Sequence, residues 1–113
     1  MNGVNVVDVE LDIFSGRPNP RWSLSPHQQE QWVAQLETTS VARDQIPIFD
    51  GLGYRGFVVF NGQEEVRVFN GRVFGFDLQQ FLDSNRSMER WLFETGRPSL
   101  PSNLIEIVTS ALR

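Results

Sequence analysis

The fold is decided by the stretch Tyr54-Arg-Gly-Phe-Val-Val-Phe-Asn-Gly-Gln-Glu-Glu-Val-Arg-Val-Phe-Asn-Gly-Arg-Val-Phe-Gly-Phe76. Two Asn-Gly pairs, at residues 61–62 and 70–71, divide it into three segments rich in Val and Phe. Asn-Gly favours the type I′ turn, because both central positions of that turn need a positive φ, and this turn joins the strands of a two-residue hairpin. The stretch therefore predicts a three-stranded antiparallel meander.

The second turn also predicts which residues lie opposite one another. With a two-residue turn, Val68 pairs with Val73 and Arg67 pairs with Phe74. One face of the meander then carries valines and faces the core. The other face carries Arg67, Phe69, Arg72 and Phe74. Such a face is either covered by the Phe14 side of the first strand or partly open, and an open one would suit a polar or sugar-like ligand.

A fourth strand is predicted near the N-terminus. From Val4 to Phe14, apolar residues alternate with polar ones, which is the pattern of a half-buried strand. Three carboxylates, those of Asp8, Glu10 and Asp12, share one face of this strand. They are interpreted as a solvated face paired with arginines of neighbouring strands, or alternatively as ligands of Ca²⁺ or Mg²⁺. We favour the arginine pairing, and expect no metal site and no cofactor.

Helical segments are predicted before and after the meander. Ser25 is the expected N-cap of the first, with Gln28 completing a capping box, and this helix runs to about Glu37. Residues 38–53 have no periodic pattern and are expected to form a loop. The other helical segments are Asp77 to Leu82, Met88 to Gly96 and Ser102 to Leu112. The expected fold is a single α+β domain over residues 1–113, with an antiparallel sheet of about four strands and helices packed on one face.

Composition narrows the function classes. The net charge of −4 argues against a nucleic-acid partner, which would need a basic face. No apolar run approaches the roughly 20 residues that cross a bilayer, and the N-terminus lacks the features of a signal peptide, so no membrane association is expected. The absence of cysteine favours the cytoplasm as location. All ten basic residues are Arg, whose planar group binds carboxylates through two parallel hydrogen bonds.

The loop after the first strand is predicted to be rigid. Pro18 and Pro20 fix their own φ angles and restrict Arg17 and Asn19 to extended conformations. A rigid loop loses little entropy when it binds a partner, which suits a recognition loop. The alternative interpretation is a structural corner built from ordinary turn residues.

Arginine donors and aromatic rings near this loop define the predicted ligand-binding site. These residue types are enriched at recognition hot spots. Arg97 belongs to a second Gly-Arg-Pro tripeptide, and it would form a two-armed clamp with Arg17 if the fold brought the two together. The predicted site consists of Ser15, Arg17, Asn19, Arg21, Trp22, Tyr54, Arg55 and Arg97.

These residues predict a non-enzymatic binding module for a polar, anionic or peptide ligand. One alternative is a protein-interaction or assembly module, including a homodimer formed through a sheet edge or the Arg/Phe face. A second alternative is a small enzyme, with Asp12 or Asp50 as general base and Arg17 or Arg55 stabilising developing charge. No motif of a known enzyme class is present in the sequence.

Overall fold

The two Asn-Gly turns connect antiparallel strands in the predicted register. β4 (Phe57–Asn61) pairs with β5 (Glu64–Phe69), and β5 pairs with β6 (Arg72–Phe74). Val68 lies opposite Val73 and Arg67 opposite Phe74, as predicted. The computed structural model describes residues 6–75 and 79–113, so Val4 and Phe76, at the predicted strand ends, lie outside the described residues.

The sheet is larger than expected. The described residues form seven antiparallel strands, so the prediction of about four is wrong. β1 (Val7–Leu11) is the predicted N-terminal strand, and it pairs centrally, between an additional strand and β4. The additional strands are β2 (Arg21–Ser23), β3 (Ser40–Val41) and β7 (Gln80–Leu82). Each has two or three residues, too few for an alternating pattern to be visible in the sequence.

β7 replaces part of a predicted helix. Residues 80–82 pair with β6, with Phe81 opposite Val73, instead of continuing a helical turn. The spacing of Leu78, Phe81 and Leu82 resembles a helical face, but the free edge of β6 supplies hydrogen-bond partners that local periodicity does not reveal. Asp77, the predicted cap, and Leu78 lie outside the described residues.

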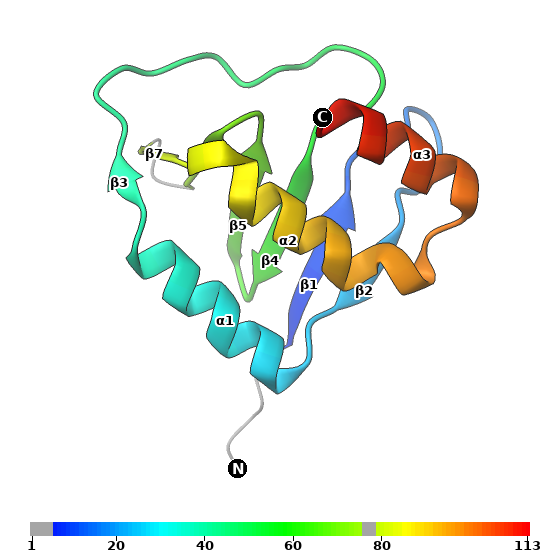
Figure 1. Cartoon of the computed structure of the whole chain (residues 1–113), viewed down its shortest axis with the longest axis horizontal. Coiled ribbons are helices and arrows are strands. Elements are labelled where there is room, and N and C mark those ends of the chain that lie inside the picture. The colour runs from blue at the N-terminus through cyan, green and yellow to red at the C-terminus, as the bar shows by residue number, and fades with distance from the viewer. Residues whose placement is uncertain (1–5, 76–78) are drawn as a thin grey trace.

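Three helices cover one face of the sheet (Figure 1). α1 (Pro26–Glu37) begins with the predicted capping box, because Ser25 and Gln28 each bond the backbone N–H of the other. The carboxylate of Asp83 accepts hydrogen bonds from the N–H groups of Met88 and Glu89, in the first turn of α2 (Ser87–Gly96). The remaining helical segments are α3 (Ser102–Ala111) and two short 3₁₀ turns, η1 (Ser84–Arg86) and η2 (Arg97–Ser99).

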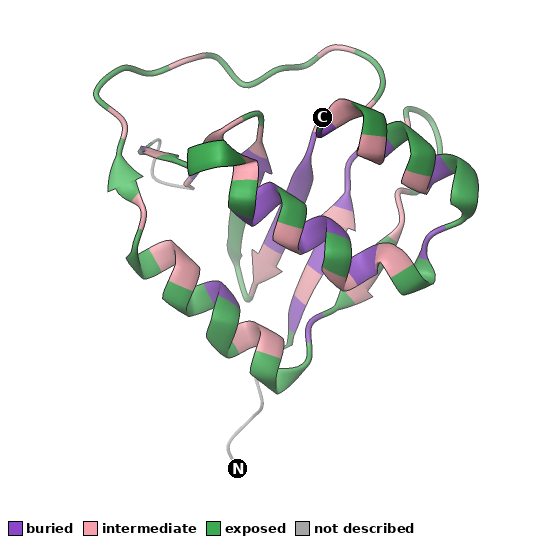
Figure 2. Cartoon of the chain, in the orientation of Figure 1, coloured by how far each residue is buried: buried purple, intermediate pink, exposed green. Residues whose placement is uncertain are grey.

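The hydrophobic core lies between these helices and the sheet, and buried residues follow β1, β4 and α2 (Figure 2). Trp32 of α1 stacks on Trp91 of α2, with ring centroids 6.5 Å apart, and this pair connects two of the helices. The buried core also includes Val9, Leu11, Phe57, Val59, Val68, Val73, Leu92, Leu104 and Val108. None of the helices formed by the described residues is long and apolar enough to cross a membrane.

The opposite face of the meander is covered by the long loop between β3 and β4. Asp44 accepts a hydrogen bond from Arg72, and both backbone groups of Ile46 bond the side-chain amide of Gln80. Phe49 of this loop stacks on Phe69, with centroids 5.9 Å apart. The mixed Arg and Phe face is therefore neither fully open nor covered by the Phe14 side of the first strand.

Gly56, just before β4, should tolerate no side chain. Its φ is +88°, and a Cβ there would lie 2.4 Å from the carbonyl oxygen of Val68. We expect Gly56→Ala to lower the free energy of unfolding by about 2–4 kcal/mol, measured by urea denaturation. Gly16→Ala is the matched control, because Gly16 has a φ of +80° but open space around it, and it should cost only about 1 kcal/mol. Equal losses for both variants would contradict the steric argument.

Candidate functional site

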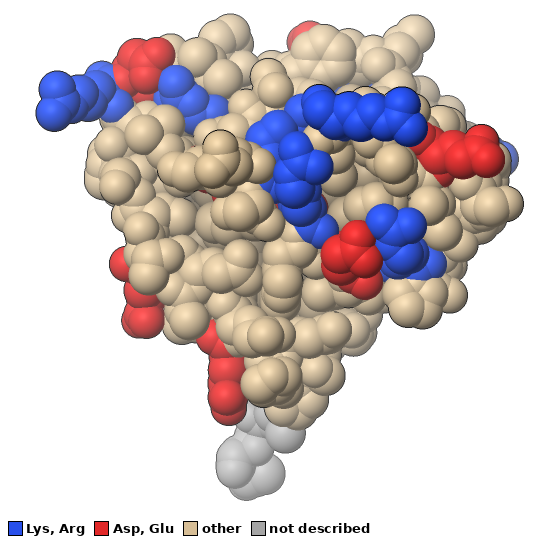
Figure 3. All heavy atoms as spheres, viewed as in Figure 1, with Lys and Arg blue, Asp and Glu red and all other residues tan. Residues whose placement is uncertain are grey.

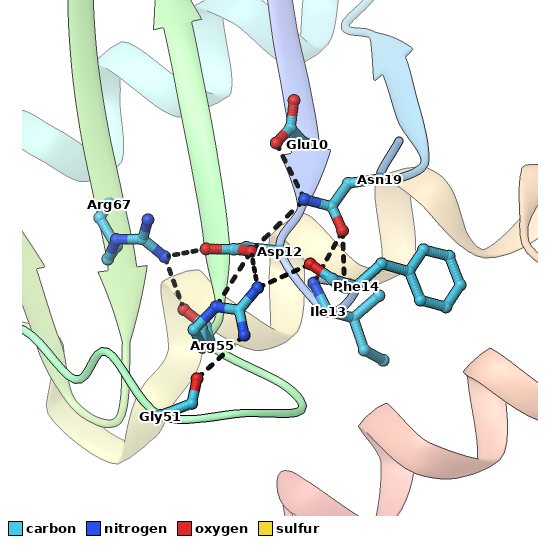
Figure 4. Close-up of polar contacts among 8 residues, drawn as sticks. All are labelled: Glu10, Asp12, Ile13, Phe14, Asn19, Gly51, Arg55 and Arg67. Atoms are coloured by element: carbon cyan, nitrogen blue, oxygen red, sulfur yellow. Dashed lines mark hydrogen bonds and ion pairs between the residues drawn. The ribbon is translucent and has the colours of Figure 1, made fainter. Parts of the chain in front are cut away.

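The carboxylate of Asp12, directly after β1, is the centre of a charged cluster (Figure 4). One of its oxygens accepts hydrogen bonds from Nε and Nη2 of Arg55, at 3.1 and 2.7 Å. The other oxygen accepts a 2.8 Å hydrogen bond from Nη1 of Arg67. The exposed fractions of the three side chains are only 12%, 13% and 24%. The cluster is thus largely withdrawn from water, and each carboxylate oxygen is bound by an arginine.

The guanidinium of Arg55 also holds two loops together. Its Nη2 donates to the carbonyl of Phe14 at 2.9 Å, and its Nη1 donates to the carbonyl of Gly51 at 2.9 Å. Phe14 belongs to the loop between β1 and β2, and Gly51 belongs to the long loop that precedes β4. A single side chain therefore fixes the two loops relative to each other and to the sheet (Figure 4).

Asn19 closes the base of the loop between β1 and β2. Its side-chain oxygen accepts hydrogen bonds from the backbone N–H groups of Ile13 and Phe14, at 3.0 and 2.7 Å. Its amide nitrogen donates to Glu10 at 3.2 Å and to Asp12 at 3.4 Å. These contacts tie both ends of the loop to the charged cluster, in addition to the rigidity that the two prolines provide.

The arginines around Asp12 decide its protonation. Burial by itself would raise the pKa of Asp12, but the hydrogen bonds and positive charges of Arg55 and Arg67 outweigh it and hold the pKa below the ordinary value of 3.8. The carboxylate is therefore ionised at neutral pH. A general base that acts near neutrality would need a raised pKa, so this environment fits a structural carboxylate.

The tips of the two loops form one exposed surface, which we call the two-loop surface (residues 14–18 and 49–53). Both loops lie at the same end of the sheet (Figure 1). The guanidinium of Arg17 lies 3.7 Å from the centroid of the Phe14 ring. Within residues 6–75 and 79–113, Arg17 has no carboxylate partner. Leu52 is 85% exposed and Phe49 is 47% exposed, and Asp50 is also exposed. The surface therefore combines apolar side chains with a free cation and one carboxylate.

Half of the eight predicted site residues lie at this end of the sheet. Ser15 and Arg17 are exposed on the two-loop surface, whereas Asn19 and Arg55 lie beneath it and hold the loops in place. The structure thus brings these four together but divides them into two groups. Two are accessible to a ligand, and two are engaged by the protein itself.

The other four predicted residues have different surroundings. The guanidinium of Arg21 bonds Asp8 and lies over the ring of Phe60. Trp22 and Tyr54 pack against the core on the helix side, where the Trp22 N–H donates to the hydroxyl of Thr95 at 2.9 Å. Arg97 pairs with Glu94 and lies over Phe93. The Arg17/Arg97 clamp therefore stays a prediction.

The carboxylate row of β1 is paired with arginines. Asp8 accepts hydrogen bonds from Arg21 and Ser23 of β2, Glu10 lies 3.6 Å from Arg21, and Asp12 is held as described above. Among the described residues, no group of three His, Cys, Asp or Glu side chains is arranged to hold a metal ion. The opposite charges on adjacent strands instead stabilise the sheet.

A second charged cluster, on the helix side, was missed by the sequence analysis. Glu89 of α2 is fully buried, and its carboxylate accepts hydrogen bonds from the Tyr54 hydroxyl, from both Nε and Nη2 of Arg86 and from the backbone N–H of Asn70. Arg86 also donates to the carbonyl of Ala111 at 2.9 Å, at the end of α3. Burial, and next the negative charge of Glu89, raise the pKa of Tyr54 above its ordinary value. The only sequence signal was the spacing of Arg86 and Glu89, three residues apart at the start of a helix, and pairs with this spacing are common on exposed surfaces.

The chain matches no family model, no curated protein and no solved structure. Its function is therefore inferred from the geometry of the two-loop surface and the clusters beneath it.

Removing the charge of Asp12 should destabilise the fold in a pH-dependent manner. Because the pKa of Asp12 is lowered in the folded state, its stabilising contribution is complete above 3.8, the ordinary value, and disappears as the pH falls further. We expect Asp12→Asn to cost about 3 kcal/mol at pH 7, since two arginines lose their counter-ion. The difference from the parent protein should shrink below pH 3.8 in chemical denaturation. A difference that does not change with pH would contradict this account. Asp44→Asn, at an exposed carboxylate paired with Arg72, is the control and should have little effect.

Glu89 should be far more important for stability than a similar residue on the same helix. We expect Glu89→Gln to lower the free energy of unfolding by about 3 kcal/mol, because Arg86 is left without its counter-ion in a buried setting. Glu94→Gln provides the comparison, since Glu94 also pairs with an arginine three residues away but is exposed. Thermal unfolding of both variants measures the contrast. Similar melting temperatures for the two would refute it.

Proposed function

We propose that the protein is a non-enzymatic binding module that recognises an acidic peptide or protein segment through the two-loop surface. The observation that carries this proposal is Arg17, a free guanidinium stacked on Phe14 at the tip of a loop whose base is fixed by Asn19. An arginine in this situation is available to form two parallel hydrogen bonds with a carboxylate.

Rigidity supports a recognition role for this loop. Binding a ligand with a flexible loop costs entropy for each side chain and backbone torsion that becomes ordered. Here the hydrogen bonds of Asn19 and Arg55 order the loop before any ligand arrives. The ring of Phe14 also restricts the guanidinium of Arg17 through a cation–π contact.

The charge and apolar character of the surface support an acidic peptide or protein segment as the ligand. The net charge of the chain is −4, and arginine and carboxylate side chains are interspersed on the face seen in Figure 3. The guanidinium of Arg17, which has no carboxylate partner among the described residues, attracts an acidic partner. Leu52 and Phe49 offer apolar contacts that a small anion would not use. A segment with a carboxylate next to an apolar side chain complements both features.

An enzymatic role receives less support from the charged cluster. Asp12 binds arginines through both carboxylate oxygens and stays ionised, so it has neither the free position nor the raised pKa of a general base. A homo-oligomeric assembly through the same surface would use the same residues. Such an assembly would need an acidic patch on the partner copy to meet Arg17.

Arg17 should dominate recognition. We expect a phage-displayed library of random peptides, selected on the purified protein, to be enriched in Asp or Glu next to an apolar residue. For the best peptide, Arg17→Ala should weaken the Kd roughly tenfold, the loss typical of a charge-assisted hydrogen bond at an exposed site. Fluorescence anisotropy of the labelled peptide measures this change.

Two further variants separate recognition from other effects. Arg43→Ala removes another exposed arginine that has no carboxylate partner among the described residues, and it should leave the Kd unchanged. Asn19→Ala keeps Arg17 but removes the hydrogen bonds that order the loop, so it should weaken binding while leaving the ligand preference intact. Enriched peptides without acidic residues, or equal effects of Arg17→Ala and Arg43→Ala, would overturn the proposal.

A further inference from the structure

An apolar cavity lies between the long loop and the sheet, on the face opposite the helices. It has a volume of about 290 Å³. Its lining is almost entirely apolar. The described residues that line it, three of them with aromatic rings, are Ile46, Pro47, Phe49, Phe69, Asn70 and Phe74. The cavity is about half open to solvent and shares Phe49 with the two-loop surface, but no charged residue is among the described residues that line it.

The walls of the cavity are held in place by contacts outside it. The side-chain amide of Gln80 bonds the N–H of Ile46 at 3.1 Å and its carbonyl at 2.8 Å, so this part of the loop is fixed to β7. On the other side, Phe49 stacks on Phe69, and Phe69 also meets the edge of the Tyr54 ring at 5.6 Å. Phe74 is buried on β6. Contacts with β7 and with Phe69 therefore hold the loop in place, and the cavity does not depend on a bound molecule to stay open.

Asn70 supplies the polar group at the mouth of the cavity. It is exposed, and its backbone N–H is held by Glu89 at 2.8 Å, so its position at the turn is fixed. Its side-chain amide bonds no other group in the part of the chain that the structure describes. A ligand that fills the apolar space can thus meet an unengaged side-chain amide, with both a donor and an acceptor, on a backbone that is fixed.

We propose that this cavity binds a small aromatic molecule with a single hydrogen-bonding substituent, such as a phenol. An apolar cavity of about 150 Å³ is already large enough for benzene, and this one leaves room for a ring with one substituent. The three phenylalanine rings favour an aromatic ring through offset or edge contacts. The amide of Asn70 selects for a hydroxyl group at one edge of that ring.

This site does not rest on the function proposed for the two-loop surface. The two sites share Phe49, but none of the described residues that line the cavity contacts the guanidinium of Arg17, which lies over the ring of Phe14. The variant Arg17→Ala should therefore leave binding in the cavity unchanged. Failure of one proposal would leave the other standing.

The test is a titration of the full chain with 4-fluorophenol, followed by ¹⁹F NMR. For a ligand of this size we expect saturable binding with a Kd on the order of 1 mM. The matched probe 4-fluorotoluene, which has a methyl group in place of the hydroxyl, should bind several-fold more weakly. If binding does not saturate at a 4-fluorophenol concentration about ten times the expected Kd, the proposal is overturned.

Three variants locate the site. Phe49→Ala removes the ring of a half-exposed loop residue that lines the cavity, and it should raise the Kd of both probes at least fivefold. Asn70→Gly keeps the positive φ of the turn, which glycine adopts freely. It should raise the Kd of 4-fluorophenol and leave the Kd of 4-fluorotoluene unchanged. Phe60→Ala removes a half-buried ring elsewhere on the same face of the sheet, and it should change the Kd of neither probe.

The pattern across these variants decides the outcome. Equal losses for Phe49→Ala and Phe60→Ala would refute the location, provided circular dichroism shows that both variants are folded. Equal effects of Asn70→Gly on both probes would refute the role of the amide. If N-acetyl-tyrosinamide bound at least tenfold more tightly than 4-fluorophenol, a peptide side chain would replace the small molecule as the occupant.

Discussion

The contact between Asp12 and two arginines is the constraint on which the arrangement of the loops depends. A carboxylate that is largely withdrawn from water costs free energy unless cations and hydrogen bonds compensate it. Arg55 and Arg67 provide this compensation from the segment before β4 and from β5. Once Arg55 is fixed by Asp12, its remaining N–H groups can reach the carbonyls of Phe14 and Gly51. The charge of Asp12 thus helps to set the positions of both loops.

Two consecutive residues connect this cluster to the second one across the sheet. The side chain of Arg55 bonds Asp12 on the loop side, while the side chain of Tyr54 bonds Glu89 on the helix side. Neighbouring residues in an extended segment point to opposite faces, so this division follows from the local backbone. Glu89 in turn holds the turn at Asn70, which lies at the mouth of the apolar cavity. The charged clusters on the two faces are therefore linked through one short segment that enters β4.

Local patterns in the sequence predicted the elements whose signals are contained in a few adjacent residues. The Asn-Gly turns gave the register of the meander, and Ser25 with Gln28 gave the start of α1. The short edge strands and β7 could not be predicted in this way, because their partners lie elsewhere in the chain.

The same limit applies to the candidate site. Asp12 and its partners are 43 and 55 residues apart, so the sequence could show three acidic residues on a strand but not which cations would meet them. Trp22 and Tyr54 were interpreted as ligand contacts because aromatic residues near arginines suit both recognition and core packing.

The two faces of the sheet are covered in physically different ways, and this difference explains where a ligand site can arise. Helices satisfy their own backbone groups and can pack closely through apolar side chains, as α1, α2 and α3 do. An irregular loop has no internal ladder of hydrogen bonds, so its backbone needs partners from the sheet. Here Arg72, Gln80 and Arg55 provide them at Asp44, Ile46 and Gly51. Side chains of this length hold the loop backbone at a distance from the strands, and the apolar side chains between them do not fill all of the space. The cavity next to Phe74 is a consequence of covering a sheet with a loop that is held by long polar side chains.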